Sequence, residues 1–578
     1  MAINAATAKD HSNDPAVACC RFEAGTTITP ENLEDPAIFA DLEESGLLAV
    51  PSNCLTIGQV LGVKLAKTID ALTPITPEYI ESPNATSVPA AALTSTASVA
   101  AAAPTASSNN VIIHIGEGKD ISLSFPLGSV PFAATTPQQS PVVSVPGKPP
   151  KVLRSLKRRY FKIDAVTFGS ETKIQDQTLT LRSAEELCKE AIASEELVVD
   201  LKLDIITPDR YNEYSDTIMD VQPIACKELG ELGSGITRVL DGIVLMVTGT
   251  DENGVQIGEF GSSEGILEEN IKWGRPGAPD KGDILIKTTV VIKAGANMER
   301  PGPLAAHKAS DIIATEIRKA LKEAADELCV REEEFVQHSR PDKPRVVIVK
   351  EVMGQGAMHD NLILPTEPVG TLGARPNVDL GNLPVVLSPI EVLDGAIHAL
   401  TCIGPASKEC SRHYFREPLI MHALQDEEID LLGVIFVGSP QANSEKFYVS
   451  KRLGMTIEAM RADGAIVTTE GFGNNHIDFA SHIEQIGERG IGVVGVTYSA
   501  VQGALVLGNK HMKHMIDVNK SEVGIENEIL CYNTLCHEDA VRAMAMIKAV
   551  IAGEPVKAAE KSWTPAVVEN NTRAIQGR

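Results

Sequence analysis

The stretch LLGVIFVGSPQANSEKFYVSKRLGMTIEAMRADGAIVTTEGFGNNHIDFASHIEQIGERGIGVVGVT (Leu431–Thr497) decides the fold class of this chain. Short β-branched runs alternate in it with polar loops and with segments of helical periodicity. The expected strands and helices, in order, are Leu431–Gly438, Glu445–Ala462, Gly464–Glu470, Ile477–Arg489 and Ile491–Thr497. Strand, helix and strand at this spacing predict the βαβ units of a doubly wound parallel sheet.

Sheets of this kind bind ligands outside the carboxyl ends of their strands. The most polar loop at a predicted strand end is Thr468–Asp478, which reads TTEGFGNNHID. Its Glu470 and His476 are candidates for holding a zwitterionic substrate. The alternative, in which this loop only supplies turn residues and an N-cap for the next helix, stays open.

The region upstream of this domain is predicted to be β-rich from Lys151 onward. The expected strand segments are Phe161–Gly169, Leu179–Arg182, Leu197–Ile206, Ile236–Thr248, Asp283–Lys293, Pro344–Val352 and Leu383–Leu387. The DENG sequence of Asp251–Gly254 predicts a hairpin turn. One long helix is expected over Ala305–Val330, so that Cys329, like Cys188, would be a packing residue within a helix.

Composition divides the chain into four parts. Residues 1–82 form a small unit, and residues 83–150 are low-complexity linkers around a strand pair at Val111–Leu127. The linkers contain too little apolar surface to offset the entropy of ordering them. Residues 151–401 are mixed β/α, and residues 402–578 are α/β. We therefore expect a multidomain α/β protein, with a β-rich middle region, a doubly wound parallel domain and a small N-terminal extension.

The overall charge and the cysteine usage restrict the partners and the compartment. The 578 residues include 52 Lys and Arg against 77 Asp and Glu, which gives a formal charge of −25. Such an acidic surface disfavours nucleic acid and anionic membranes as partners. No apolar stretch is long enough to span a membrane, and no secretory signal is recognised at the start. Ten scattered cysteines fit a reducing cytoplasm.

A second stretch, Asp394–Pro418, concentrates reactive side chains: DGAIHALTCIGPASKECSRHYFREP. At its centre Thr401 directly precedes Cys402, and two histidines, two arginines and a second cysteine surround them. One interpretation is that Cys402 is a small buried apolar residue, as most free cysteines are. The other is that Cys402 is a nucleophile with titratable groups beside it.

The second interpretation is supported by resemblance to a known family. The segment ALTCIGPASKECSRHYFREPL resembles the processing site of the D-proline reductase family of proproteins, which is similar to the pyruvoyl-forming subunits of glycine, sarcosine and betaine reductases. Further matching segments are Asp204–Ala225, Phe260–Arg275, Lys293–Asp311 and Val346–Asn361. The resemblance covers residues 150 to 578.

The resemblance implies cleavage between Thr401 and Cys402, with Cys402 converted to an N-terminal pyruvoyl group. A thiolate at Cys402 can attack the Thr401 carbonyl and form a thioester. β-Elimination then leaves dehydroalanine, which hydrolyses to a ketone and ammonia. This elimination needs a base for the α-proton, and His398 and His413 are the candidates because imidazole titrates near neutrality.

The resemblance also implies a function and a set of partners. The expected activity is reductive opening of D-proline to 5-aminopentanoate, with a selenocysteine-containing subunit, an electron-donating dithiol protein and the two cleavage fragments in one hetero-oligomer. Arg412 and Arg416 could hold the substrate carboxylate, or they could pair with Glu409 or Glu417. Two alternatives remain: a glycine, sarcosine or betaine reductase subunit, and an unprocessed scaffold that binds an amino acid.

No metal site is predicted from the sequence. Cys531, Cys536 and His537 do not have the spacing of a structural zinc motif. His511 and His514 lie three residues apart, which is more typical of a partly exposed helix face.

Overall fold

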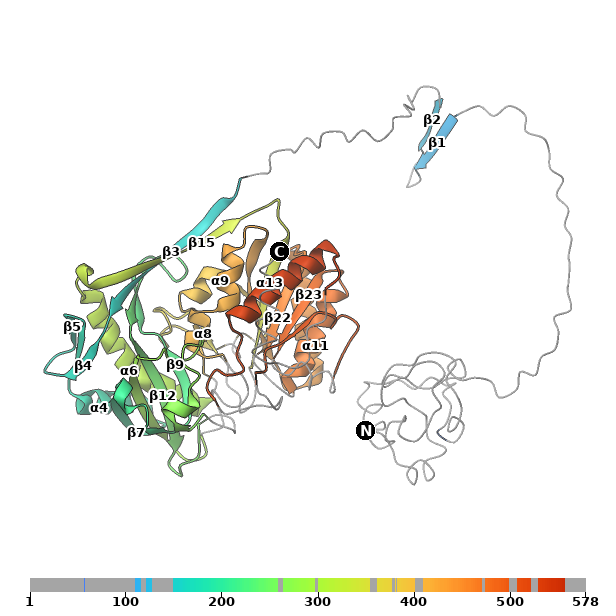
Figure 1. The fold of residues 1–578 in the computed structure, drawn as a ribbon. Helices are drawn as coiled ribbons and strands as arrows, with labels where there is room; N and C mark the ends of the chain where they lie inside the picture. The colour runs from blue at the N-terminus through green and yellow to red at the C-terminus, as the bar shows by residue number, and fades with distance from the viewer. Residues whose placement is uncertain are drawn as a thin grey trace, which may run out of the picture. The chain divides into compact units, whose positions relative to one another are not determined.

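A computed structural model describes the chain in two compact units, Met1–Gln138 and Gln139–Arg578 (Figure 1). The described residues are 57, 110–115, 121–126, 149–257, 263–296, 300–353, 361–376, 380, 382–400, 409–469, 474–497, 507–520 and 529–556. In the first unit, β1 (Asn110–Ile115) and β2 (Ile121–Pro126) pair antiparallel. Apart from Ile57, the expected unit at residues 1–82 lies outside the described residues.

The second unit contains the predicted parallel sheet. Its strand order is β19-β21-β16-β22-β23-β24, and all neighbours are parallel except β19, which pairs antiparallel with β21 at one edge. These strands are β16 (Arg345–Met353), β19 (Val385–Leu387), β21 (Asp430–Ser439), β22 (Gly464–Thr469), β23 (Gly492–Thr497) and β24 (Met515–Asp517). The α/β fold class is therefore confirmed.

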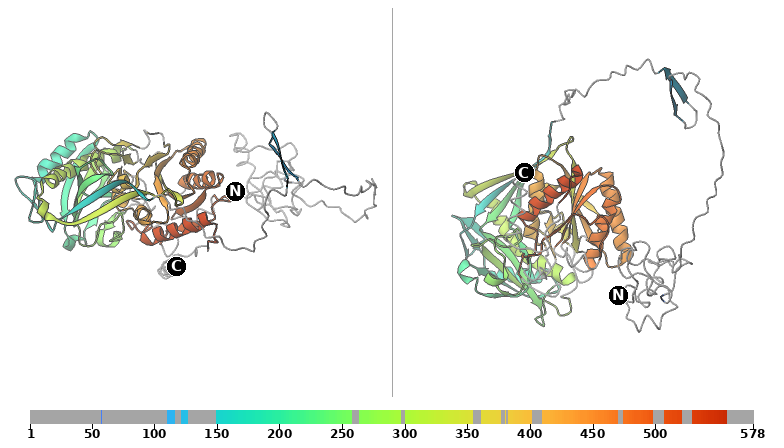
Figure 2. Two further views of the ribbon diagram at one scale, coloured as in Figure 1. Left: turned by 90° about the horizontal axis from the view of Figure 1, so that it is seen from above. Right: turned by 45° about the vertical axis from the view of Figure 1, so that its right-hand side comes forward.

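Helices cover both faces of this sheet (Figures 1 and 2). One face packs against α10 (Asn443–Ala459) and α11 (Asn474–Gly487), and the other against α9 (Pro418–Gln425) and α13 (His537–Ala552). Successive residues of a strand point to opposite faces. In β16, Val347 and Val349 therefore join the first core, while Val346 and Ile348 join the second. Burial on both sides explains the continuous β-branched run.

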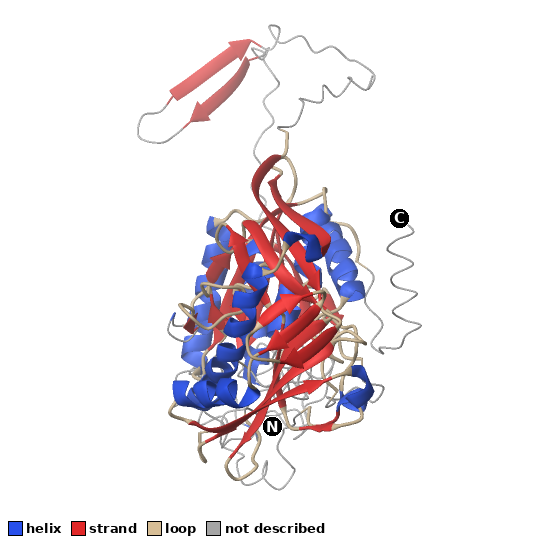
Figure 3. Cartoon of the chain, turned by 90° about the vertical axis from the view of Figure 1, so that its left-hand side faces the viewer, coloured by secondary structure: helices blue, strands red, loops and turns tan. Residues whose placement is uncertain are grey.

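The β-rich region is built on two four-stranded sheets. The first has the order β10-β11-β3-β15 and the second β7-β14-β12-β9. A shared core joins the two sheets to helices α4 (Ala184–Ser194) and α6 (Pro301–Glu323). The strands are β3 (Lys151–Lys162), β7 (Val198–Ile206), β9 (Ile218–Gln222), β10 (Ala225–Leu229), β11 (Gly235–Asp241), β12 (Ile243–Asp251), β14 (Ile284–Ile292) and β15 (Cys329–Ser339). Figure 3 shows the helices lying against the faces of the sheets.

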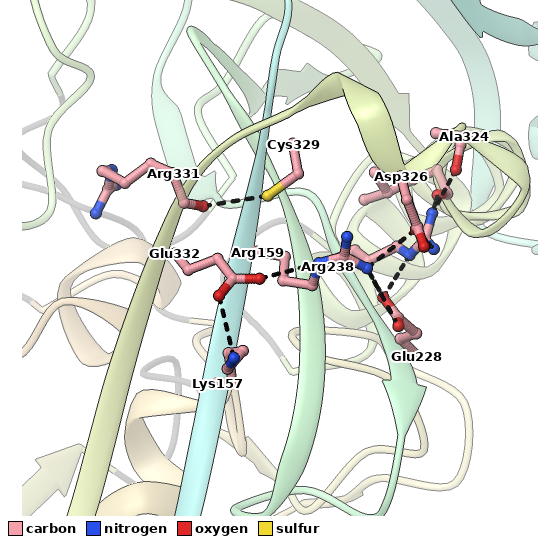
Figure 4. Close-up of polar contacts among 10 residues, drawn as sticks. Lys157, Arg159, Glu228, Arg238, Ala324, Asp326, Cys329, Arg331 and Glu332 are labelled. Carbon is pink, nitrogen blue, oxygen red and sulfur yellow. Dashed lines mark hydrogen bonds and ion pairs between the residues drawn. The ribbon is translucent and has the colours of Figure 1, made fainter.

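The long helix expected over Ala305–Val330 is corrected by the structure. Helix α6 begins at Pro301 and ends at Glu323, and Cys329 begins β15 instead of lying in a helix. The helical pattern breaks at Ala324, whose backbone is extended; η5 (Asp326–Leu328) follows, and the charges of β15 are matched across the sheet and not along a helix. Glu332 lies opposite Arg159 in β3, and Lys157 binds Glu332 at 3.0 Å. Figure 4 shows the wider network. Opposite charges facing each other across strands favour the strand pair.

The expected cleavage site lies within the crossover that joins β16 to its parallel neighbour β21. The remaining described elements, several of them in this crossover, are β4 (Ala165–Phe168), β5 (Lys173–Gln175), β6 (Thr178–Leu181), η4 (Pro208–Arg210), β8 (Tyr214–Ser215), β13 (Gly265–Ile266), α5 (Leu267–Asn270), η5 (Asp326–Leu328), β17 (Leu362–Ile363), β18 (Arg375–Pro376), α7 (Pro389–Leu393), β20 (Ile397–His398) and α8 (Ser411–Phe415). Among the described residues, no helix is long and apolar enough to cross a membrane.

Candidate functional site

Three of the predicted site residues, Thr401, Cys402 and Glu470, lie outside the described residues. The described chain ends at Leu400 and resumes at Glu409, so the geometry available is that of the two flanks of the expected cleavage site.

Ser411 connects both flanks to one carboxylate. Its Oγ accepts a hydrogen bond from the backbone N–H of Ala399 at 2.8 Å and donates one to Oδ2 of Asp220 at 2.5 Å. The backbone N–H of Ser411 donates to Oδ1 of Asp220 at 2.9 Å. Asp220 belongs to β9 and is fully buried. We call these three residues the Ser411 anchor; it fixes the two flanks of the segment that contains the expected cleavage site against the β-rich region.

His398 lies just before this anchor, at the end of β20, and is fully buried. Its Nδ1 lies 2.9 Å from the carbonyl oxygen of Val369, which can only accept, so Nδ1 carries the proton and Nε2 a lone pair. Nε2 is 2.7 Å from Nδ1 of His307 in α6. Burial lowers the pKa of His398 to about 4, so the ring is neutral at neutral pH.

His413 lies on the other flank, in α8, and has a different electrostatic environment. Its Nε2 is 3.3 Å from Glu409 and 3.8 Å from Glu417. Burial would lower the pKa of His413, but the charge of Glu409 outweighs it and raises this pKa to about 9. Lys350 of β16 binds the same two carboxylates at 2.7 and 2.9 Å. We call Lys350, Glu409, His413 and Glu417 the Lys350 cluster. It holds two cationic and two anionic groups, all buried.

Arg412 and Arg416 do not form the expected pairs with Glu409 or Glu417. Both guanidinium groups bind Oδ2 of Asp280 at 2.8 Å, and Arg412 also lies 3.2 Å from Asp283. Arg416 donates further hydrogen bonds to three backbone carbonyls of the same loop, residues 275–278. These contacts tie α8 to the β-rich region.

A second polar cluster lies on the opposite face of β16, at the carboxyl end of the parallel strands. Glu351 accepts a hydrogen bond from Thr469 at 3.2 Å and lies 3.8 Å from Nε2 of His482. Lys446 pairs with Asp478, which also accepts a hydrogen bond from Ser439 at 2.6 Å. Asp478 and His482 are on α11, as is His476.

The structure places the predicted His476 in this part of the fold. It is buried, its ring lies 5.4 Å from that of Phe479, and burial lowers its pKa.

Sequence reasoning missed four buried polar residues that the fold brings to these places: Asp220, His307, Lys350 and Glu351. A signal for two of them was present, because a Lys–Glu pair inside the apolar run VVIVKEV is unexpected in a strand buried on both faces. Asp220 and His307 carried no such signal, since neither lies close in sequence to its partners.

Comparison with known proteins relates most of this chain to one family. The sequence profile described as glycine/sarcosine/betaine reductase component B subunits matches residues 154–504. The D-proline reductase proprotein PrdA of Acetoanaerobium sticklandii is 61% identical, with 100% of this chain and 95% of that protein aligned.

Other relatives are more distant. The glycine reductase complex component B subunits alpha and beta of the same organism are 26% identical over 59% of this chain and 79% of that protein. The sarcosine reductase complex component B subunit alpha of Peptoclostridium acidaminophilum is 27% identical over 27% of this chain and 35% of that protein. No solved structure matches this chain.

Proposed function

Because the chain belongs to the family of glycine, sarcosine and betaine reductase component B subunits, we propose that it is the proprotein of a D-proline reductase subunit. In this proposal the chain cleaves itself between Thr401 and Cys402, and Cys402 becomes a pyruvoyl group. The product subunit opens D-proline reductively to 5-aminopentanoate, together with a selenocysteine-containing partner and a dithiol protein as electron donor.

The observation that carries this proposal is the Ser411 anchor. Self-cleavage needs the Cys402 thiolate held against the carbonyl of the preceding residue, and this requires a constrained segment. The anchor holds Ala399 and Ser411, which lie on either side of the segment, through one hydroxyl and one buried carboxylate. Attack forms a thioester between Thr401 and Cys402. β-Elimination breaks the Cβ–S bond, and Thr401 leaves with the sulfur as a thiocarboxylate.

The two flanking histidines suit different parts of this chemistry. His398 is neutral at neutral pH, so it is the candidate for accepting the α-proton of Cys402. His413 is protonated at neutral pH, so it is the candidate for stabilising the negative charge that develops on the Thr401 oxygen. We propose that the cleavage chemistry is divided between them in this way.

The topology explains how the two products would stay together. Cleavage at residue 401 would leave β16 and β19 on the upstream fragment and β21 to β24 on the downstream fragment. In the sheet, β21 lies between β19 and β16, and β16 lies between β21 and β22. Strands of the two fragments therefore alternate, and neither fragment can leave without breaking ladders on both sides of a strand.

A pyruvoyl group fits the described surroundings. It would supply a ketone that condenses with the amine of the substrate and makes the nitrogen a better leaving group. The buried charges of the Lys350 cluster adjoin this segment, where they would orient polar groups and limit the access of water. Arg412, Arg416, Glu470 and His476 remain the proposed contacts to the substrate. The two arginines would have to share their guanidinium groups with Asp280.

Substrate choice rests on the extent of the matches. The D-proline reductase proprotein aligns with all of this chain, including residues 1–150, whereas the glycine reductase relative aligns with 59% of it. D-proline is therefore preferred to glycine, sarcosine or betaine. We further propose that the enzyme acts in the cytoplasm.

The proposal is tested by treating the purified complex with borohydride or phenylhydrazine, which consume ketones. We expect loss of D-proline reduction with either reagent, protection by D-proline against phenylhydrazine, and a mass increase confined to the fragment that begins at residue 402. Full activity after complete borohydride treatment would contradict the pyruvoyl mechanism. Turnover of glycine but not of D-proline, with the partner subunits present, would overturn the substrate assignment alone.

A further inference from the structure

Among the described residues, two buried groups of side chains have ligand atoms close enough together to surround a cation. One is Glu409, His413 and Glu417, and the other is Asp220, His307 and His398; in each, the three ligand atoms lie within 4.8 Å of one another. The first group has a cation of its own. The Nζ atom of Lys350 lies 2.7 Å from Glu409 and 2.9 Å from Glu417, so an ammonium group already neutralises these carboxylates.

The second group has no such cation. Among the described residues, no lysine or arginine pairs with Asp220, which is fully buried and is held by Ser411 and by the amide of Gln222 at 2.8 Å. In the part of the chain that the structure describes, the only ion-pair partner of Asp220 is His307, at 3.9 Å. A buried carboxylate without a full positive charge beside it is costly, and a bound metal ion is one of the usual ways of compensating it.

Gln222 adds a fourth ligand position to this group. Its Nε2 atom lies 3.2 Å from Nε2 of His398 and 3.5 Å from Nδ1 of His307, besides its contact with Asp220. Its Oε1 atom is buried and has no hydrogen-bond partner among the described residues. Amide orientation is set by the surrounding network. Turning this amide by half a rotation would give up the Nε2 bond to Asp220 and would bring Oε1 to the point that Asp220, His307 and His398 face. Binding an ion there would also require His307 as the tautomer that carries its proton on Nε2, since Nδ1 donates to His398 in the metal-free network.

The separations among the four side chains scatter around the edge length of a tetrahedral site. Zinc binds imidazole nitrogen and carboxylate oxygen at about 2.0–2.2 Å, which places ligand atoms about 3.3 Å apart in a tetrahedron. The measured separations lie on both sides of this value: 2.7 Å between the two histidine nitrogens, 3.9 Å between His307 and Asp220, and 2.8, 3.5 and 3.2 Å from the Gln222 amide to Asp220, His307 and His398.

Two of the ligands also form a hydrogen bond through the atom that would not bind the ion, as metal ligands usually do. The Nδ1–H of His398 donates to the Val369 carbonyl at 2.9 Å, which leaves Nε2 facing the group. Oδ1 of Asp220 accepts the Ser411 N–H at 2.9 Å, which orients the carboxylate. We propose that Asp220, Gln222, His307 and His398 bind one first-row divalent transition ion of the Zn²⁺ type. The two imidazoles favour such an ion over Mg²⁺ or Ca²⁺, which prefer oxygen ligands only.

The ion would link three elements, β9, α6 and β20. Asp220 would then be both a ligand of the ion and part of the Ser411 anchor. All four ligands precede residue 401, so the site would remain on the upstream fragment. The lone pair of Nε2 of His398 cannot hold an ion and accept a proton together. Zinc is therefore expected to slow self-cleavage; this consequence rests on the proposed function, whereas zinc binding does not.

The test is to load the full chain with Zn²⁺, remove free metal by gel filtration, and measure zinc by elemental analysis. We expect about one ion per chain in the wild type, and with Co²⁺ a visible spectrum of four-coordinate cobalt without thiolate charge-transfer bands, because the ligands are nitrogen and oxygen. His307→Ala should abolish retention and Gln222→Leu should weaken it at least tenfold. Gln222→Glu should keep it. His413→Gln is the matched control. It should bind zinc like the wild type, because Lys350 already neutralises the two carboxylates beside His413.

The proposal would be overturned by any of three results: a wild type that retains no zinc after loading, thiolate bands in the cobalt spectrum, or unchanged zinc retention in Gln222→Leu. Circular dichroism identifies variants that do not fold. If His307→Ala is one of these, the two Gln222 variants decide. Cleavage is followed separately on a denaturing gel, so failure to bind zinc and failure to cleave are distinguishable.

Discussion

At the scale of single residues, the geometry proposed for cleavage depends on Ser411 and Asp220, which no local sequence pattern connects. Asp220 and Ser411 are 191 positions apart. The positions of His398 and His413 beside Thr401–Cys402 are visible in the sequence, and their role in cleavage stays a prediction. Their opposite protonation states could not be predicted, because these depend on burial and on Glu409, Glu417 and Lys350. Such environments arise from tertiary packing, whereas a sequence shows only residue types.

Replacing Ser411 with alanine should slow self-cleavage. The change removes the acceptor of the Ala399 N–H and leaves a buried donor unpaired, which costs about 1–3 kcal/mol. If this cost raises the activation free energy of cleavage, cleavage slows by about tenfold or more. The measurement is the half-time of fragment formation on a denaturing gel. Ser450→Ala is the control, because Ser450 is also buried and its hydroxyl has no partner among the described residues. Equal half-times in both variants would contradict a role for the anchor.

His482 should make the fold sensitive to acid. Burial lowers its pKa from the ordinary 6.5 to about 3, so the folded chain keeps the ring neutral where the unfolded chain binds a proton. Its contribution to stability is complete above pH 6.5 and is lost as the pH falls toward 3. Between pH 6.5 and 4 it contributes a slope of up to about 1.4 kcal/mol per pH unit. The free energy of unfolding of His482→Gln, measured by urea titration, should fall less steeply over this range. Parallel curves for variant and wild type would disprove this assignment.

At the scale of elements, the parallel domain was predictable and the strand β15 was not. Strands buried on both faces leave continuous β-branched runs, and the helices between them have their own period, so β21, α10, β22, α11 and β23 appear near their expected positions. The sequence pattern extends α6 to Val330, and the charged run that follows, residues 331–334, shows no strand alternation of its own. Only its partners in β3, Lys157 to Arg159, identify it as a strand, and these lie 150 or more positions away.

Gly249, two residues before the end of β12, should tolerate no side chain. Its φ is +156°, and a Cβ atom there would lie 1.9 Å from the Val290 carbonyl oxygen of β14. Gly249→Ala should therefore lower the free energy of unfolding by about 3 kcal/mol or more, through backbone strain and displacement of β14. Gly508→Ala, which meets nothing within 4 Å, should change it by less than about 0.5 kcal/mol. Similar urea midpoints for the two variants would show that β12 and β14 can separate enough to accommodate a Cβ atom at residue 249.

At the scale of the whole molecule, the sheet order makes the proposed cleavage compatible with one stable particle. The strands of the two fragments would alternate over β19, β21, β16 and β22 of one sheet, and the core on the α9 and α13 face contains residues of both. Cutting the crossover between β16 and β21 removes a covalent connection but none of these contacts. We therefore expect the fragments to unfold together and to separate only in denaturant.

The most direct test of the central claim is mass measurement on the active protein, first under native and then under denaturing conditions. We expect one native particle that contains both fragments. After denaturation we expect two polypeptides, residues 1–401 and 402–578, with the second blocked at its N-terminus by the pyruvoyl group. A fully active preparation that consists of the intact 578-residue chain would contradict the account.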